Sequence, residues 1–289
     1  MSEIRIGISG WTYPPWRGVF YPAALPHGQE LEYASRQVNS IEINGTFYGL
    51  QKPSRFRAWH EATPDDFVFA VKGSRYLTHL TRLKDPKKPL ANFFASGVLE
   101  LKEKLGPLLW QLPPNFHYDR RLLENFFNLL PRDGEAAEKL ARCHDSKLRV
   151  RASLKARAKI AIRHALEVRH PSFETAEFVA LLREHDIAMV VADTAGKWPL
   201  IEDVTADFIY IRLHGPEELY ASGYTETALD SWARKIRDWS DGGTPRDGRL
   251  LTPPLPKRRA GRDVYAYFDN DAKTHAPFDA ISLAKRLVT

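Results

Sequence analysis

The feature that most restricts the fold of this chain is a series of short apolar runs that recurs along its whole length. Helical periodicity separates most of the runs from one another. They cover residues 4–9, 40–44, 67–72, 107–111, 164–169, 187–193, 208–214 and 264–270. Runs of this length that lack strict alternation are typical of strands buried on both faces. The pattern therefore predicts a parallel sheet.

Amphipathic stretches fill most of the intervals between these runs. Apolar residues at spacings of three and four predict helices over 90–105, 122–130 and 229–239, and Thr225 is the expected N-cap of the last one. Strands that alternate with helices in this way favour the α/β class and a (β/α)8 barrel of the TIM type. Single barrels reach this length, so we expect one TIM-barrel domain over residues 1–289.

Two details refine the predicted barrel. The interval between Asp193 and Asp207 is short and is interrupted by a glycine and a proline, so we expect the sixth helix to be degenerate. The alternative architecture is an open doubly wound sheet, which normally carries a glycine-rich phosphate turn after its first strand. Residues 9–12 do not form such a turn, and this favours the barrel.

Composition bears on the compartment. Forty-three per cent of the 289 residues are hydrophobic, which is enough for a large core, yet no run of 18 apolar residues occurs. The first residues resemble a strand rather than a secretion signal. Cys143 is the only cysteine, which excludes an internal disulfide and a cysteine-based metal cluster. We expect a cytoplasmic protein with no membrane contact.

The net charge of +6 is concentrated in two basic inserts, at about 142–163 and 241–262. The first holds eight basic residues against one acid, and residues 246–262 hold six against one, so these stretches carry +12 and the rest of the chain −6. Each insert joins a helix to the next strand, which predicts a location on the face opposite the strand C-termini. They are either solvated loops or a contact surface for nucleic acid. Residues 148–163 could form a basic helix.

Polar and ionisable residues stand at the C-terminal ends of all eight predicted strands. They are Ser9, Glu42, Asn44, Lys72, Gln111, Glu167, Arg169, His170, Asp193, Arg212, His214, Asp269 and Asn270. Barrel enzymes place their active sites at these strand ends. The ring of residues therefore predicts a functional pocket.

Within this ring, five residues carry the groups that acid/base catalysis uses. They are Glu42, Lys72, Glu167, Asp193 and His214. Ten residues of the ring and of the following loops are expected to bind substrate: Asn44, Tyr48, His79, Gln111, Arg169, His170, Arg212, Asn270, Trp11 and Tyr13. Arginine pairs with phosphate or carboxylate, and aromatic rings stack on sugars or nucleobases. A small anionic ligand is therefore the expected partner.

Metal binding is the other chemistry open to the ring. Glu42, Glu167, Asp193 and His214 have suitable side chains for zinc or a harder divalent ion. No HxH or HExxH motif is present, and the cations at the strand ends would repel a metal ion. We expect no metal site and no required cofactor, with a divalent ion as the alternative.

The same residues carry a family resemblance. The motifs are 7–11 with Tyr13 and Trp16, 20–22, 38–48, 67–72, 78–79, 105–107, 111–114, 167–170, 192–194, 210–216, Tyr220, 232–233 and 267–271. With this set the chain resembles the YecE-like family, known as domain of unknown function 72. The resemblance implies a TIM-barrel fold and names no reaction.

Three functions remain open at this point. The first is an enzyme that applies acid/base chemistry at the strand ends to a phosphorylated or carboxylated compound resembling a sugar or nucleotide. The second is a metal-dependent phosphodiesterase or nuclease similar to the apurinic endonuclease barrels. The third is a non-catalytic protein that binds nucleic acid through the basic inserts.

Overall fold

The computed structural model describes residues 2–155 and 160–288, and its eight strands close into a parallel barrel in chain order. The strands are β1 Ile4–Ser9, β2 Ser40–Ile43, β3 Val68–Lys72, β4 Leu105–Gln111, β5 His164–Glu167, β6 Ala188–Asp193, β7 Phe208–Leu213 and β8 Asp263–Phe268. Pairing of β8 with β1 completes the barrel. The predicted fold is confirmed. Arg157 and Lys159 of the first basic insert, and Met1 and Thr289, lie outside the described residues.

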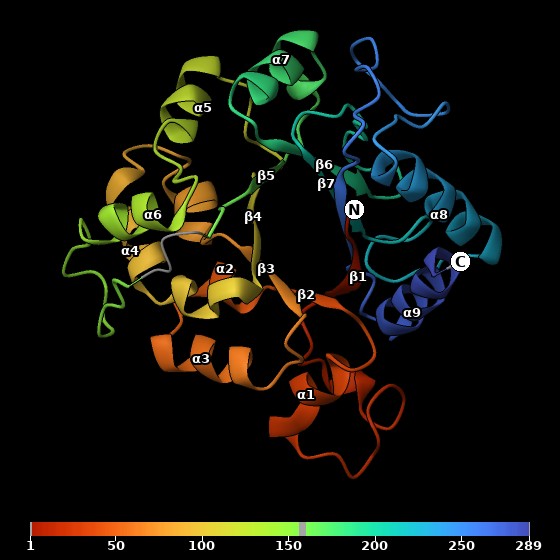
Figure 1. Cartoon of the computed structure of the whole chain (residues 1–289), viewed down its shortest axis with the longest axis horizontal. Coiled ribbons are helices and arrows are strands. Elements are labelled where there is room, and N and C mark those ends of the chain that lie inside the picture. The colour runs from red at the N-terminus through yellow and green to blue at the C-terminus, as the bar shows by residue number, and fades with distance from the viewer. Residues whose placement is uncertain (1, 156–159, 289) are drawn as a thin grey trace.

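Helices surround the barrel as an outer ring (Figure 1). They are α1 Glu30–Ala34, α2 Gly45–Tyr48, α3 Pro53–Glu61, α4 Lys87–Ala95, α5 Arg120–Phe127, α6 Gly134–Ala141, α7 Ala176–Glu184, α8 Glu226–Ser240 and α9 His275–Leu287. Shorter turns include η3 Tyr76–Leu80 and η4 Val98–Lys104. No helix in the described part of the chain is both long enough and apolar enough to cross a bilayer.

Local signals set where several helices begin and end. Thr225 caps α8 as predicted, because its hydroxyl accepts a hydrogen bond from the Ala228 amide. The stretch predicted as one helix over 90–105 is instead divided into α4 and η4. Gly97 separates them with φ of 119°, and a β-carbon at this position would lie 2.6 Å from the Cα of Pro53. The periodicity therefore predicted the apolar face of this segment correctly but did not predict the interruption of the helix at Gly97.

No helix connects β6 to β7, which confirms the degenerate sixth unit. The 194–207 connection is held instead by the second basic insert. The backbone amides of Arg249 and Leu251 donate hydrogen bonds of 2.7 Å to the buried carboxylates of Glu202 and Asp203. The insert thus occupies the flank that a sixth helix covers in a regular barrel, between α7 and α8 (Figure 1).

The first basic insert also runs along the flank. Near its start, Lys147 lies over the ring of Tyr76, which follows the C-terminal end of β3. Further along, Ser153 donates a 2.5 Å hydrogen bond to Glu100 in η4, which precedes β4. The prediction that both inserts lie on the face opposite the strand C-termini is therefore wrong. The described parts of 148–163 form no helix either.

The interior of the barrel combines alanine and valine with large side chains, several of them tyrosines. The inward cluster is Ala70, Leu109, Ala165, Ala188, Val190, Ala192, Phe208, Tyr210, Tyr265 and Tyr267. Alternate residues of a strand point to opposite faces, so each inward residue places the residue two positions later in the interior as well. This alternation decides which strand-end residues face the centre of the barrel.

Candidate active site

Arg212 occupies the centre of the strand-end layer. It lies two residues after Tyr210, so β7 directs it into the barrel, where its side chain is fully buried. Its guanidinium donates to Glu42 at 2.9 and 3.1 Å, to Glu167 at 2.8 Å and to Asp269 at 2.9 Å. One buried cation therefore joins three carboxylates from β2, β5 and the end of β8.

Neighbouring groups complete this buried network. Tyr210 donates a 2.6 Å hydrogen bond to Glu42, and Ser9 donates one of 2.5 Å to the same carboxylate. Arg169 donates to Glu167 at 2.7 Å. Asp269 also lies 2.9 Å from Nδ1 of His214. Each of the three carboxylates thus has at least two polar neighbours, as buried charges require.

The network determines the charge of its members. Burial acts to raise the pKa of Glu167, but Arg169 and Arg212 outweigh it and hold that pKa well below its usual range. Burial opposes ionisation of Asp269 too, and Arg212 again lowers its pKa. Burial and the nearby Arg212 lower the pKa of His214. Glu167 and Asp269 are therefore ionised at neutral pH and His214 is uncharged.

The proposed metal ligands do not converge on one point. Glu42 and Glu167 direct oxygen atoms at the guanidinium of Arg212, so a side-chain cation stands where a metal would bind. Asp193 accepts a hydrogen bond from Tyr224 at 3.0 Å instead of joining them. Among the described residues, no group of three or more His, Cys, Asp and Glu side chains is arranged to hold a metal ion. The donor set does not fit the divalent-metal alternative.

A cavity of about 820 Å³ opens above this network. Eight of the predicted site residues line it: Trp11, Tyr13, Asn44, Tyr48, Lys72, His79, Gln111 and Arg169. The same cavity is lined by residues that were not among the predicted catalytic or substrate-binding residues, namely Arg55, Trp59, Arg75, Tyr220, Asp269 and Asp271. Asp269 and Asp271 belong to the motif 267–271. Asp269 was predicted to lie in the strand-end ring, and its position two residues after Tyr267 was the signal that it also faces the cavity.

Among the polar groups on this cavity, those of Lys72 and Asn44 are buried and have no partner within the described protein. Lys72 Nζ makes no hydrogen bond or ion pair and lies 4.5 Å from the centre of the Phe47 ring, although its side chain is buried. Asn44 Oδ1 is buried and accepts no hydrogen bond. Buried polar groups are nearly always satisfied, so the two unpartnered atoms mark a place for a ligand.

Among the titratable groups on the cavity, Lys72, Asp271 and His79 have shifted pKa values that bear on proton transfer. Burial, and secondly the charge of Arg212, lowers the pKa of Lys72 to about 8. Burial, and secondly Asp269, raises the pKa of Asp271 to about 6. Burial and the neighbouring Lys72 lower the pKa of His79 to about 4. At neutral pH, Lys72 and Asp271 are thus close to the point at which they exchange protons.

Three of the predicted residues belong neither to the cavity lining nor to the buried network around Arg212. Strand alternation turns Asp193, His170 and Asn270 away from the barrel axis. Asp193 lines a neighbouring cavity of about 640 Å³. His170 accepts a hydrogen bond from the Ser172 amide. Asn270 donates to Asp279 of α9 at 2.8 Å and so connects β8 to that helix.

Comparison with known proteins agrees with this architecture. A family model described as a protein of unknown function, DUF72, matches residues 5–289. The UPF0759 protein YecE of Escherichia coli is 31% identical over 113 residues, and the UPF0759 protein YunF of Bacillus subtilis is 27% identical over 118 residues. The aligned stretch spans 39% of this chain in both cases, and 39% of YecE and 41% of YunF.

Solved structures cover the full chain. A DUF72 family protein of Thermotoga maritima has 25% sequence identity and a TM-score of 0.74, with 99% of this chain and 100% of that chain covered. A DUF72 family protein of Enterococcus faecalis, 15% identical, has a TM-score of 0.70 over 99% of this chain and 96% of that chain, and it shows the fold alone. The chain belongs to the DUF72 family.

Proposed function

We propose that this chain is an enzyme that carries out acid/base chemistry on a phosphorylated or carboxylated compound of sugar or nucleotide type. The observation that carries the proposal is the buried ammonium of Lys72, which faces the cavity with no carboxylate partner. The nearby carboxylates of Glu42 and Glu167 are bound to Arg212. An unpaired buried charge is costly, and an anionic ligand would supply its missing partner.

The lining of the cavity supports a ligand with both an anionic group and a ring. Arg55, Arg75 and Arg169 line it in addition to Lys72, and arginine binds phosphate or carboxylate through two parallel hydrogen bonds. Trp11 and Trp59 lie edge to face with ring centres 5.4 Å apart and form an aromatic part of the wall. Aromatic surfaces of this kind pack against sugar rings and nucleobases.

The proposal assigns separate roles to the ionisable residues. Asp271, with a pKa of about 6, accepts a proton from the substrate, and Lys72, with a pKa of about 8, donates one. Glu42 and Glu167 hold Arg212 in place and balance its charge. Asp193 and His214 do not exchange protons with the substrate in this scheme.

Ligand binding tests the proposal first. We expect at least one member of a panel of sugar phosphates, sugar acids and nucleotides to raise the melting temperature, with no rise from the neutral parent sugars. Lys72→Met should weaken binding of that ligand by about 10-fold to 100-fold, because the charge pair between the buried ammonium and the ligand is lost. Lys285→Met, an exposed lysine of α9, is the matched control. Equal binding by Lys72→Met and the wild type would remove the basis of the proposal.

Catalysis is tested with the ligand found in this way. Proton nuclear magnetic resonance in deuterated water should show loss of a substrate C–H signal with the wild-type protein. Asp271→Asn should retain binding and lower the exchange rate by about 100-fold, since a general base contributes on this scale. If the C–H proton of the bound ligand exchanged with deuterium only at the uncatalysed rate, the chain would be a binding protein and not an enzyme for this ligand.

A further inference from the structure

A second cavity, on the flank of the barrel, is lined by parts of three segments. They are the start of α3, the turn η4 and the extended part of the first basic insert. Its volume is about 950 Å³, and it shares no lining residue with the strand-end cavity. We call it the flank groove, lined by Lys52, Pro53, Ser54, Arg57, Leu99, Glu100, Lys102, Arg149, Val150, Arg151, Ala152, Ser153, Leu154 and Lys155.

The charge of the flank groove is strongly unbalanced. Six of its lining residues are Lys or Arg, and Glu100 is the acid among them. Glu100 binds Arg57 at 2.9 Å and Ser153 at 2.5 Å, so its charge is already compensated. The other five cations make no hydrogen bond or ion pair through their side chains with any described residue: Lys52, Lys102, Arg149, Arg151 and Lys155. The groove therefore has about five positive charges available to a ligand.

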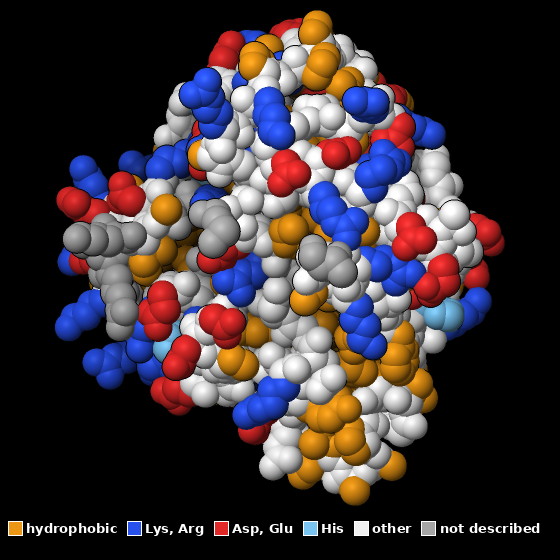
Figure 2. All heavy atoms as spheres, turned by 45° about the vertical axis from the view of Figure 1, so that its right-hand side comes forward, with side chains coloured by type: hydrophobic (Ala, Val, Ile, Leu, Met, Phe, Trp, Pro, Cys, Tyr) orange, Lys and Arg blue, Asp and Glu red, His pale blue; other side chains and the backbone are white. Residues whose placement is uncertain are grey.

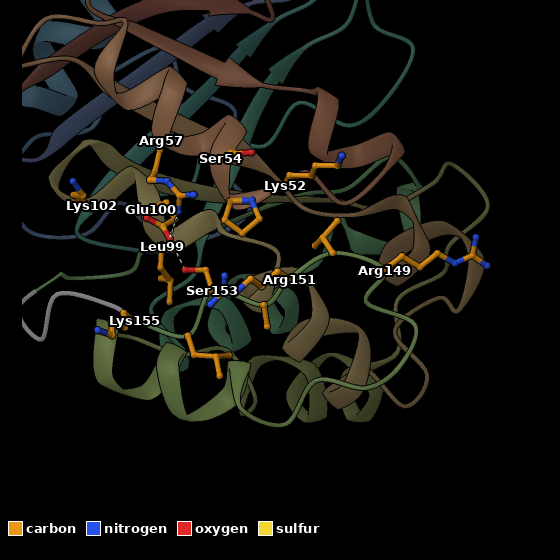
Figure 3. Close-up of a pocket in the computed structure, with 14 residues that line it drawn as sticks. Lys52, Ser54, Arg57, Leu99, Glu100, Lys102, Arg149, Arg151, Ser153 and Lys155 are labelled. Carbon is orange, nitrogen blue, oxygen red and sulfur yellow. Dashed lines mark hydrogen bonds and ion pairs between the residues drawn. The ribbon is translucent and has the colours of Figure 1, made fainter.

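These cations are spread along the groove instead of meeting at one point. Figure 3 shows Lys102 and Lys155 toward one end, Arg151 in the middle, and Arg149 at the opposite end. Lys52 projects from the opposite wall, from the start of α3. Because these cations lie at both ends and on both walls of the groove, one phosphate or carboxylate cannot pair with all of them. An elongated ligand with repeated negative charges fits this arrangement.

The chemistry of the lining distinguishes between kinds of polyanion. Double-stranded DNA carries one charge per roughly 1.7 Å of its length, whereas an acidic peptide carries at most one per residue, or about 3.3 Å when extended. Five cations without acidic partners along one groove can pair with more charges of the denser ligand. No aromatic or histidine side chain belongs to the groove lining, so bases have nothing to stack on. Contacts would be to the sugar-phosphate backbone.

We propose that the flank groove binds the phosphate backbone of a nucleic-acid duplex, without regard to sequence. The site is independent of the proposed reaction in the strand-end cavity. It also refines the general expectation that the basic inserts bind nucleic acid. The first insert contributes Arg149, Arg151 and Lys155 to the groove, whereas the second contributes none of the lining.

The measurement is fluorescence anisotropy of a labelled DNA duplex of about 20 base pairs with the full chain, between about 50 and 200 mM KCl. We expect the logarithm of the binding constant to fall with the logarithm of salt concentration with a slope of about −4 to −5. A duplex of scrambled sequence should bind equally well. No detectable binding at about 50 mM salt would overturn the proposal.

Matched variants locate the site. Arg149→Ala, Arg151→Ala and Lys155→Ala together should make the slope less steep by about 3 and weaken binding on the order of 100-fold near 100 mM salt. The control removes three exposed cations of the second insert through Arg246→Ala, Lys257→Ala and Arg259→Ala. The control should bind within about threefold of the wild type, since its charges lie outside the groove. Equal losses in both triple variants would show an effect of net charge and would overturn the assignment.

Poly-L-glutamate separates the two classes of polyanion. We expect it to compete with the duplex only weakly, because its charges are more widely spaced along the chain. Competition as strong as that of unlabelled duplex would assign the groove to acidic protein segments instead. Circular dichroism and melting temperatures of both triple variants establish that any loss of binding does not come from unfolding.

Discussion

The strand-end cavity and the flank groove both carry several cations, but the two regions differ in how the positive charge is compensated. Under the cavity, Arg212 is fully buried and three carboxylates compensate it. In the groove, Arg149, Arg151 and Lys155 are exposed and have no acidic partner among the described residues. A buried charge has to be neutralised by fixed neighbours, whereas water solvates an exposed one. The first arrangement favours chemistry on one defined ligand, and the second favours loose binding of a polymer.

The surface near the second insert shows a third arrangement. Figure 2 shows Lys and Arg interspersed with Asp and Glu over the face that carries α8 and α9. Ion pairs in this part of the chain include Arg234 with Asp247 at 2.8 Å and Lys273 with Glu218 at 2.9 Å. Charges that alternate in sign in this way cancel at a distance. Variants of the individual regions test this contrast.

The largest effect is expected from Arg212→Met. The substitution leaves the carboxylates of Glu42, Glu167 and Asp269 buried without the cation that joins them. We expect the free energy of unfolding to fall by about 3 to 5 kcal/mol, measured by urea denaturation at neutral pH. Arg149→Met in the groove is the matched control and should change it by less than about 0.5 kcal/mol. Similar losses in the two variants would remove the distinction between the two regions.

Lys72→Met is expected to have the next largest effect, and that effect depends on pH. The pKa of Lys72 is about 8 in the folded chain against an ordinary value of 10.5, so between these values the unfolded chain binds more protons. The free energy of unfolding of the wild type therefore rises with pH across this range, by up to about 3 kcal/mol. The free energy of unfolding of the variant lacks this rise. Its advantage over the wild type is therefore largest below pH 8.

Urea denaturation of both proteins at intervals from about pH 7 to pH 10.5 measures this difference. The test uses the change of this difference with pH. An effect of methionine packing on stability that is the same at every pH therefore does not contribute. Lys285→Met should follow the wild type at every pH, because this lysine is exposed. A difference between Lys72→Met and the wild type that does not vary with pH would mean that the ammonium is not destabilised by burial.

The smallest effect is expected from Glu100→Gln, which removes the acid from the flank groove. Arg57 then loses its carboxylate partner and becomes available to a ligand. We expect duplex binding to strengthen by about threefold to tenfold and the free energy of unfolding to fall by less than about 1 kcal/mol, since the pair is partly exposed. Anisotropy titration and urea denaturation measure the two quantities. Unchanged or weaker duplex binding would argue against a phosphate ligand in the groove.

Much of the strand-end layer follows from local sequence, and alternation along each strand explains both the successes and the omissions. Lys72, Gln111 and Arg169 line the cavity because they share the phase of the inward residues Ala70, Leu109 and Ala165. Asp193, His170 and Asn270 have the opposite phase and do not line it. The same rule selects Asp269, so a stricter use of alternation would have improved the set without any structure.

The sequence by itself determined the eight strands, their parallel order in a barrel, the missing sixth helix and the family. These depend on periodicity and on short motifs, which are properties of neighbouring residues. Only the tertiary structure showed that Arg212 joins Glu42, Glu167 and Asp269, and that both basic inserts run along the flank. Contacts such as Arg249 with Glu202 join residues far apart in the chain. No local pattern records them, because they form only when the barrel closes and its connections pack against its sides.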